Sequence, residues 1–141
     1  MKQIVYTMPD GHVERVILNP RDRRDGETDE QFIARRQALD VPQGATNIIH
    51  VEQADLPEFE FRDAWEHSNG AVIINLAKAV AVQEAKIAGA MRLKARELIE
   101  RETAGENVAA EKAQLQAINS RVTAKDMTEL KASWPAGLEK I

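Results

Sequence analysis

The sequence predicts an α+β protein with a β-rich N-terminal lobe and a helical C-terminal segment. Short β-branched runs separated by Pro, Gly and Asn occupy residues 1–75, which is typical of strands joined by turns. From Asn75 to Gly105 there is no Pro and one internal Gly, and Ala is abundant, which favours a single long helix. We therefore place a β-hairpin-rich lobe with one short helix at residues 1–75. A long α-helical hairpin and a short C-terminal helix follow at residues 76–141.

Length and composition restrict the function classes. The chain has 141 residues, 43% of them hydrophobic and 30% charged, so one domain or two small lobes are expected. Because there is no Cys, disulfides, thiolate nucleophiles and Cys-type zinc sites are excluded. The sequence contains neither the apolar region of a signal peptide nor a run of about 18 apolar residues, so no membrane partner is expected.

Charge is unevenly distributed along the chain. Residues 1–70 carry eight Lys and Arg against fourteen Asp and Glu, a balance of −6, whereas residues 71–141 carry eleven against nine. Neither half is basic enough for a phosphate-binding surface, so no nucleic-acid partner is expected. The difference supports two lobes with different surfaces.

Two strands at residues 2–7 and 12–18 are joined by Met8-Pro9-Asp10-Gly11, in which Pro presets the turn and Gly accepts positive φ. The charged stretch 21–26, with three arginines, is interpreted as a solvated loop or, alternatively, as an anion or nucleic-acid contact. A short helix begins after Thr28, which can form a capping box with Gln31, and it ends before Pro42.

Further strands are predicted at residues 47–52, 61–66 and 71–75. Asn69-Gly70 is the preferred type I′ turn pair between the last two. Asn75 is a candidate N-cap for the long helix. After Gly105, a second helix from about Asn107 to Val122 is expected to fold back, and a last short helix is marked by Met127, Leu130 and Trp134.

The long helix carries two apolar stripes. One is the predicted core stripe, which the returning helix would cover through Val108, Leu115, Ile118 and Val122. Its members recur near the helix's own period: Leu76, Val80, Ile87, Met91 and Leu98. The second stripe is left without a cover and is the predicted interface with a partner or a second copy of the chain. Its members are Ala79, Val82, Gly89 and Leu93. The alternative is a core helix with Ala on an exposed face, since Ala is the best helix former.

Two tryptophans stand apart from the long helix. Trp65 and Trp134 are interpreted either as core anchors or as contacts to a partner, because aromatic residues are enriched at binding hot spots. We include both in the candidate interface.

No catalytic residue, metal ligand or cofactor site is predicted. His12, His50 and His67 lack a second ligand at helical spacing, although a metal site could form if the β lobe brought them together. His67-Ser68 lies in a turn without a nucleophile-elbow pattern. The carboxylates of the long helix alternate with arginines, which is typical of ion pairing within a helix.

Several short motifs resemble one type of phage protein. They are MPDG, DEQF, VPQGA, ADLP, FRDAW and TELKASWP, with LKA and EKAQLQ in the helical hairpin between the last two. In this order they resemble small phage and prophage proteins of the kind encoded beside tail or tail-fibre genes. The chain is also similar, more weakly, to phage tail-fibre assembly proteins.

The resemblance implies a non-catalytic interaction protein, either a tail-fibre assembly chaperone or a minor virion component. Its partners would be other phage tail or tail-fibre proteins, and it would act in the host cytoplasm during assembly or in the virion. A second hypothesis comes from charge: a regulatory or inhibitor protein could bind a host protein through the acidic N-terminal lobe.

Overall fold

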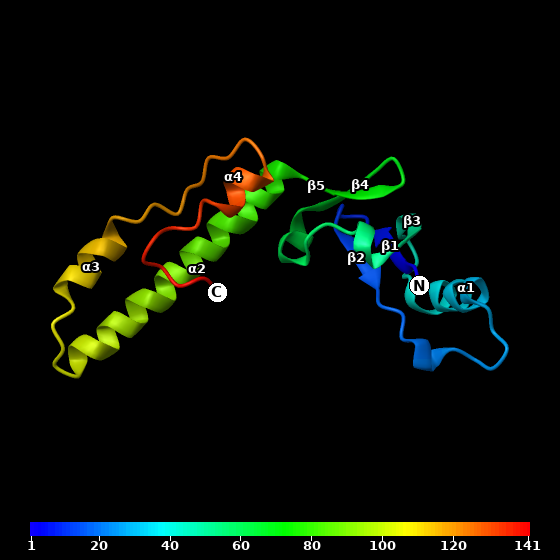
Figure 1. Ribbon diagram of the computed structural model, residues 1–141, viewed down its shortest axis with the longest axis horizontal. Helices are drawn as coiled ribbons and strands as arrows, with labels where there is room; N and C mark the ends of the chain where they lie inside the picture. The colour runs from blue at the N-terminus through cyan, green and yellow to red at the C-terminus, as the bar shows by residue number, and fades with distance from the viewer. The chain divides into compact units, whose positions relative to one another are not determined.

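A computed structural model describes residues 1–141 (Figure 1). The chain contains both strands and helices, which confirms the α+β class. It divides into two compact units, Met1–Asn75 (unit 1) and Leu76–Ile141 (unit 2). None of its helices combines the length and the apolar character needed to cross a membrane.

Unit 1 is built on an antiparallel three-stranded sheet. The strands β1 (Gln3–Thr7), β2 (Val13–Val16) and β3 (Thr46–Val51) lie in the order β2-β1-β3. The first two form the predicted hairpin, in which Gly11 has a φ of 88° and its N–H donates to the Met8 carbonyl over 2.9 Å. The positive φ explains why Gly stands at this position.

The helix α1 (Asp29–Asp40) packs on one face of this sheet. Its start has the predicted capping box: the Thr28 hydroxyl accepts from the Gln31 N–H, and the Gln31 side chain accepts from the Thr28 N–H. Phe32 and Ile33 point to the sheet and are buried. The cluster on this face consists of Ile4, Leu18, Phe32 and Ile33, with Val16 and Val41 against it.

A second hairpin covers the other part of the unit 1 core. β4 (Trp65–Ser68) and β5 (Ala71–Ile74) pair antiparallel, and Asn69 and Gly70 both have positive φ, as the type I′ turn requires. The second cluster consists of Val5, Val13, Trp65 and Val72. Unit 1 therefore has apolar cores on both sides of β1.

The strand predicted at residues 61–66 is wrong in its first half. Phe59–Ala64 forms 3₁₀ turns, and the strand begins only at Trp65. The turns bury Phe61 and Ala64, which are three residues apart, and leave Phe59 51% exposed. The near-alternate spacing of Phe59, Phe61 and Trp65 in the sequence therefore imitates a strand pattern.

Unit 2 is dominated by α2 (Leu76–Thr103). The helix ends as the sequence predicts, because Gly105 has a φ of 93°. The Glu106 N–H donates to the Arg101 carbonyl and the Gly105 N–H donates to the Glu102 carbonyl, each over 3.0 Å. This pair of bonds is a Schellman motif, which satisfies the last carbonyls of the helix.

The returning helix is much shorter than predicted. α3 (Ala109–Gln116) has eight residues, and the chain then runs back along α2 without regular structure to α4 (Met127–Lys131) (Figure 1). Beyond α3, side-chain oxygens accept hydrogen bonds from backbone N–H groups in place of the carbonyls of a helix. The Val122 N–H donates to the Glu84 carboxylate on α2 over 3.1 Å, and the Arg121 N–H donates to the Asn119 side chain.

The irregular segment still delivers apolar side chains to α2. The central cluster of unit 2 consists of Ile87, Ala90 and Leu138, with Met91, Leu115, Ile118, Val122 and Trp134 against it. The helical spacing of Leu115, Ile118 and Val122 therefore identifies residues that pack on the core, although only the first of them lies in a helix.

Candidate functional site

The core stripe of α2 is only partly as predicted. Ile87 and Leu98 are buried, whereas Leu76, Val80 and Met91 are half-buried. The residues of α2 that are buried are Ala79, Gln83, Ile87, Ala90 and Leu98. The buried face is thus rotated from the predicted one towards Ala79 and Gln83.

Ala79 and Gln83 are the two residues that change the predicted face. Ala79 was expected on the uncovered stripe but is completely buried. Gln83 is buried although it is polar, and its amide nitrogen donates to the Leu130 carbonyl over 3.3 Å and to the Ser133 hydroxyl over 3.4 Å. These bonds fasten the end of α4 to α2, so the polar side chain is part of the packing.

The rest of the second stripe is covered to different degrees, and the chain's own C-terminus lies against Gly89. Val82 is half-buried, and a Cβ placed on Gly89 would lie 3.5 Å from Cδ1 of Ile141. Leu93 alone remains open, with 52% of its surface exposed. The prediction of an uncovered apolar stripe is therefore wrong for Ala79 and Gly89 and holds for Leu93. Sequence periodicity did not show the difference, because residues 132–141 have no regular structure.

The two tryptophans are anchors within their units. Trp65 is 3% exposed, its ring meets Phe59 edge-on at 6.2 Å, and its indole N–H donates to the Glu58 carbonyl. Its place in the candidate interface is wrong, since a partner cannot reach it in the folded unit. Trp134 is half-buried on the central cluster and donates to the Leu138 carbonyl over 2.8 Å, which holds the C-terminal segment on α2.

Two adjoining hollows open on the surface of unit 2, and Lys94 and Gly137 line both of them. The larger, of about 450 Å³, lies between α2, α3 and the C-terminal segment; the smaller, of about 160 Å³, lies between α2 and residues 137–141. We call the pair the Lys94 groove. Leu93 and Ile141 line its smaller part and expose 52% and 60% of their surface.

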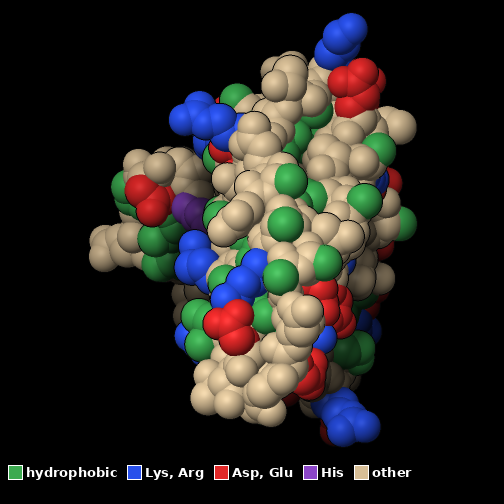
Figure 2. Space-filling view, turned by 90° about the vertical axis from the view of Figure 1, so that its left-hand side faces the viewer, with side chains coloured by type: hydrophobic (Ala, Val, Ile, Leu, Met, Phe, Trp, Pro, Cys, Tyr) green, Lys and Arg blue, Asp and Glu red, His purple; other side chains and the backbone are tan.

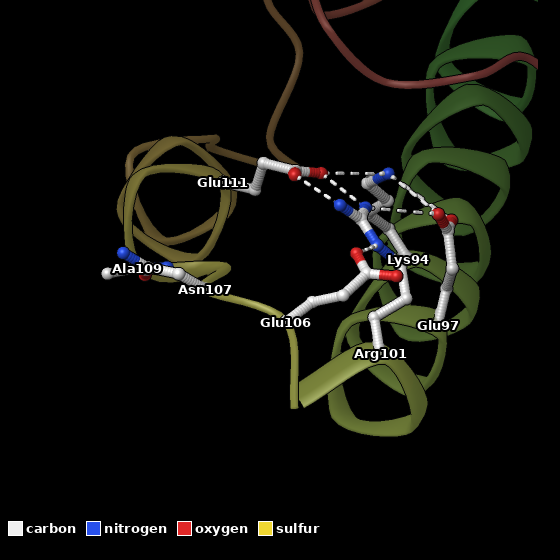
Figure 3. Close-up of polar contacts among 7 residues, drawn as sticks. All are labelled: Lys94, Glu97, Arg101, Glu106, Asn107, Ala109 and Glu111. Atoms are coloured by element: carbon white, nitrogen blue, oxygen red, sulfur yellow. Dashed lines mark hydrogen bonds and ion pairs between the residues drawn. The ribbon is translucent and has the colours of Figure 1, made fainter. Parts of the chain in front are cut away.

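An ion-pair cluster forms one wall of the Lys94 groove (Figure 3). The Arg101 guanidinium donates to both oxygens of Glu111 over 2.7 Å and to Glu106 over 2.8 Å. Lys94 lies 3.2 Å from Glu97 and 3.5 Å from Glu111. The hydrogen bond that Glu111 accepts from Arg101 lowers the pKa of Glu111. The bonds that Arg101 donates to Glu111 and Glu106 raise the pKa of Arg101.

The cluster joins α2 to α3 across the loop between them. In Figure 3 the Arg101 and Lys94 side chains point from α2 towards Glu111 on α3. Oppositely charged side chains paired in this way hold two helices together. We therefore interpret the cluster as a structural clamp between α2 and α3 and not as a site of acid–base catalysis. The groove exposes two apolar side chains, Leu93 and Ile141, beside the partly exposed Lys94 ammonium group.

Hydrophobic groups are otherwise dispersed. On the face shown in Figure 2 they form small separate groups between charged side chains, without a broad apolar patch. A contact on such a face depends on a few exposed anchors.

The histidines do not come together. His12 lies 3.1 Å from Glu14, His50 lies 2.7 Å from the Gln37 side chain, and His67 accepts from the Gly70 N–H. No group of three or more His, Asp or Glu side chains is placed to hold a metal ion.

Comparison of the chain with models of protein families, with curated proteins and with solved structures finds no match. The Lys94 groove was also not foreseen from the sequence. Lys94 and Gly137 are 43 positions apart, and the only signal for their meeting is Trp134, which fixes the C-terminal segment.

Proposed function

We propose that this protein is a non-catalytic interaction protein of a phage tail, acting as a tail-fibre assembly chaperone or as a minor virion component. The observation that carries the interaction role is the exposed pair Leu93 and Ile141 at the Lys94 groove. The tail setting rests on the resemblance of the short motifs described above.

The groove supports the proposal through its chemistry. Leu93 and Ile141 come from segments far apart in the sequence, and both leave more than half of their surface exposed. When a partner covers such apolar side chains, the burial favours binding by about 25 cal/mol for each Å² removed from water. Lys94 is already paired with Glu97 and Glu111, so the two apolar side chains carry the proposed contact.

The test is co-expression with the tail-fibre protein encoded beside this chain. We expect a complex that survives purification, and Leu93→Glu should weaken it by about tenfold or more, because the carboxylate would be buried against the partner. Ile99→Glu is the matched control: Ile99 lies on the same helix and is 60% exposed, but it does not line the groove. Absence of a complex, or equal loss in both variants, would contradict the proposal.

The two forms of the proposal differ in the fate of the protein. A chaperone would raise the yield of soluble fibre protein and be absent from purified particles. A minor virion component would remain in the particles after purification.

The second candidate is a phage regulator that binds a host protein through unit 1, and the balance of −6 over residues 1–70 favours it. Affinity purification from host extract would then return one host protein in a salt-sensitive complex. Return of background proteins alone would remove this candidate.

A further inference from the structure

The outer edge of β3 has no neighbouring strand within unit 1. β3 is the last strand in the order β2-β1-β3, so one of its edges pairs with β1 and the other is open. An open edge presents main-chain N–H and C=O groups that can pair with another strand. The question is which residues present them and what the edge faces.

The hairpin shows which neighbouring strand, β2 or β3, the main-chain groups of each β1 residue face. The Met8 N–H donates to the His12 carbonyl over 2.8 Å, so the main chain of Met8 faces β2. Because successive residues of a strand alternate, Val5 and Gln3 face β3. Their partners in the register are Ile49 and Val51, which therefore face β1.

By the same alternation, the main-chain groups of Ile48 and His50 face the open edge. The same two residues are accessible to solvent, since Ile48 is 38% exposed and His50 is also exposed. Asn47, with a φ of 51°, lies where the register shifts and ends the regular stretch. The open edge is thus about four residues long, or about 13 Å.

A groove runs beside this edge, between β3 and α1. It has a volume of about 420 Å³, and its apolar lining includes Ala34, Ala38, Val41, Ala45 and Ile48. The side chains of Gln37 and His50 also line it and hydrogen bond to each other over 2.7 Å. A strand added to β3 would direct every second side chain over this lining.

The edge carries no charged side chain that would oppose pairing. β3 reads TNIIHV and contains no Asp, Glu, Lys or Arg, although 30% of the chain is charged. The opposite edge strand, β2, carries Glu14 and Arg15, and Phe59, Arg62 and Trp65 line a hollow with it. Charged residues and covering segments are the normal ways to block an edge, so β3 is the edge left open.

We infer that β3 binds an extended segment of a partner protein as a fourth strand, seated in the groove beside α1. The segment has small or medium apolar side chains at alternate positions and Lys or Arg at its ends. Charge selects a partner over a second copy of this chain, because unit 1 carries a balance of −6 and two such units would repel each other. The inference rests on the proposed interaction function and specifies one kind of partner.

The probe is a library of random peptides of about twelve residues, selected on the full-length protein and then synthesised. We expect enriched peptides with alternating apolar residues and basic ends. Their binding should slow hydrogen exchange of the Ile48 and His50 amides, because these N–H groups become hydrogen-bonded. Protection confined to other amides, or no enrichment, would overturn the inference.

Ile48→Lys places a charge in the groove and should weaken binding by about tenfold or more. The matched control is Ile73→Lys, since Ile73 is 44% exposed in β5 of the same unit and lies outside the groove. If Ile48→Lys fails to fold, the peptide supplies the test. Methylating the peptide nitrogens that face β3 should abolish binding, whereas methylating the alternate ones should not; equal effects would overturn the inference.

Light scattering of the free protein tests whether a second copy of this chain occupies the β3 edge. A dimer with protected Ile48 and His50 amides would show that a second copy fills the edge and would overturn the inference. The proposed function can fail separately: a peptide that binds β3 while no fibre protein co-purifies supports the edge and removes the tail proposal. A fibre complex that forms while no peptide is enriched on β3 does the reverse.

Discussion

Unit 1 and unit 2 solve the problem of covering apolar surface in different ways. Unit 1 places α1 and the second hairpin around β1, and three large aromatic side chains, Phe32, Phe61 and Trp65, are buried there. Unit 2 covers one long helix with an irregular return segment and with only one aromatic residue, Trp134. The sheet of unit 1 leaves a main-chain edge open beside a groove, whereas the irregular cover of unit 2 leaves a groove lined by side chains without an open strand edge.

The two surfaces therefore present different groups. The β3 edge presents main-chain N–H and C=O groups, and the Lys94 groove presents exposed side chains. Each unit also contains one tryptophan, so the fluorescence of Trp65 and of Trp134 can follow the two units separately.

The largest expected effects come from the two cores. Phe32 and Ile87 are completely buried, so Phe32→Ala should cost about 3–5 kcal/mol in unit 1 and Ile87→Ala about 2–5 kcal/mol in unit 2. Urea unfolding should be measured with one tryptophan replaced by Phe in each case. Each variant should shift only the transition of its own unit.

The control for the core variants is Leu39→Ala, because Leu39 is 65% exposed and should change stability by less than about 0.5 kcal/mol. Equal shifts of both tryptophan signals would show that the units unfold as one, which would contradict the comparison.

A smaller effect is expected at two glycines with positive φ, Gly70 in unit 1 and Gly105 in unit 2. A Cβ meets no atom within 4 Å at either position, so Ala adds backbone strain without a clash. Gly70→Ala and Gly105→Ala should each cost about 1–2 kcal/mol, again in their own unit. The control is Gly89→Ala, which has no positive φ and gains a contact with Ile141 at 3.5 Å; a larger cost there would refute the strain argument.

The clamp of unit 2 should contribute little and depend on salt. Arg101→Met removes the bonds to Glu106 and Glu111, and the pairs are partly exposed. We expect a small drop in the urea midpoint reported by Trp134, which high salt reduces because it screens the wild-type pairs. Arg96→Met, an exposed position on the same helix, serves as the control. A large drop that is independent of salt would show that packing of the side chain dominates.

The corresponding pair in unit 1 should depend on pH. Hydrogen bonds from Arg35, over 2.8 and 3.0 Å, lower the pKa of Glu27 from 4.5 to about 2. A lowered pKa in the folded state adds stability above pH 4.5, and this part is lost as the pH falls from 4.5 towards 2. Glu27→Gln lacks this contribution, so the difference in stability between the variant and the wild type should shrink as the pH falls.

Trp65 fluorescence in urea, at neutral pH and near pH 3, measures this difference. Glu30→Gln provides the control, since Glu30 is exposed in the first turn of α1. A difference between Glu27→Gln and wild type that stays constant with pH would contradict the assignment.

The sequence predicted most of the local structure because the signals are local. Pro9 and Gly11, the Thr28–Gln31 box, Asn69-Gly70 and Gly105 each act through their own backbone and nearest bonds. The sequence failed where a distant segment decides. Trp65 and Ala79 look equally suited to a core or an interface until the elements that bury them are known.

The candidate sites could be predicted only in part. Leu93 was identified as an exposed apolar residue from helix periodicity, but its neighbour Ile141 lies on a segment without any period. The β3 strand was predicted, yet its position at the edge follows from the pairing order of the strands. Periodicity describes one element at a time and carries no information on which element packs on which.

The α+β class, the turns, the Thr28 capping box and the long helix are predictable from the sequence alone, because they depend on backbone preferences within a few residues. Tertiary structure decided which side of α2 is buried, how the C-terminus covers Gly89, and that the uncharged strand β3 is left at an open edge. The physical reason is that burial and strand pairing depend on contacts between residues far apart in the chain.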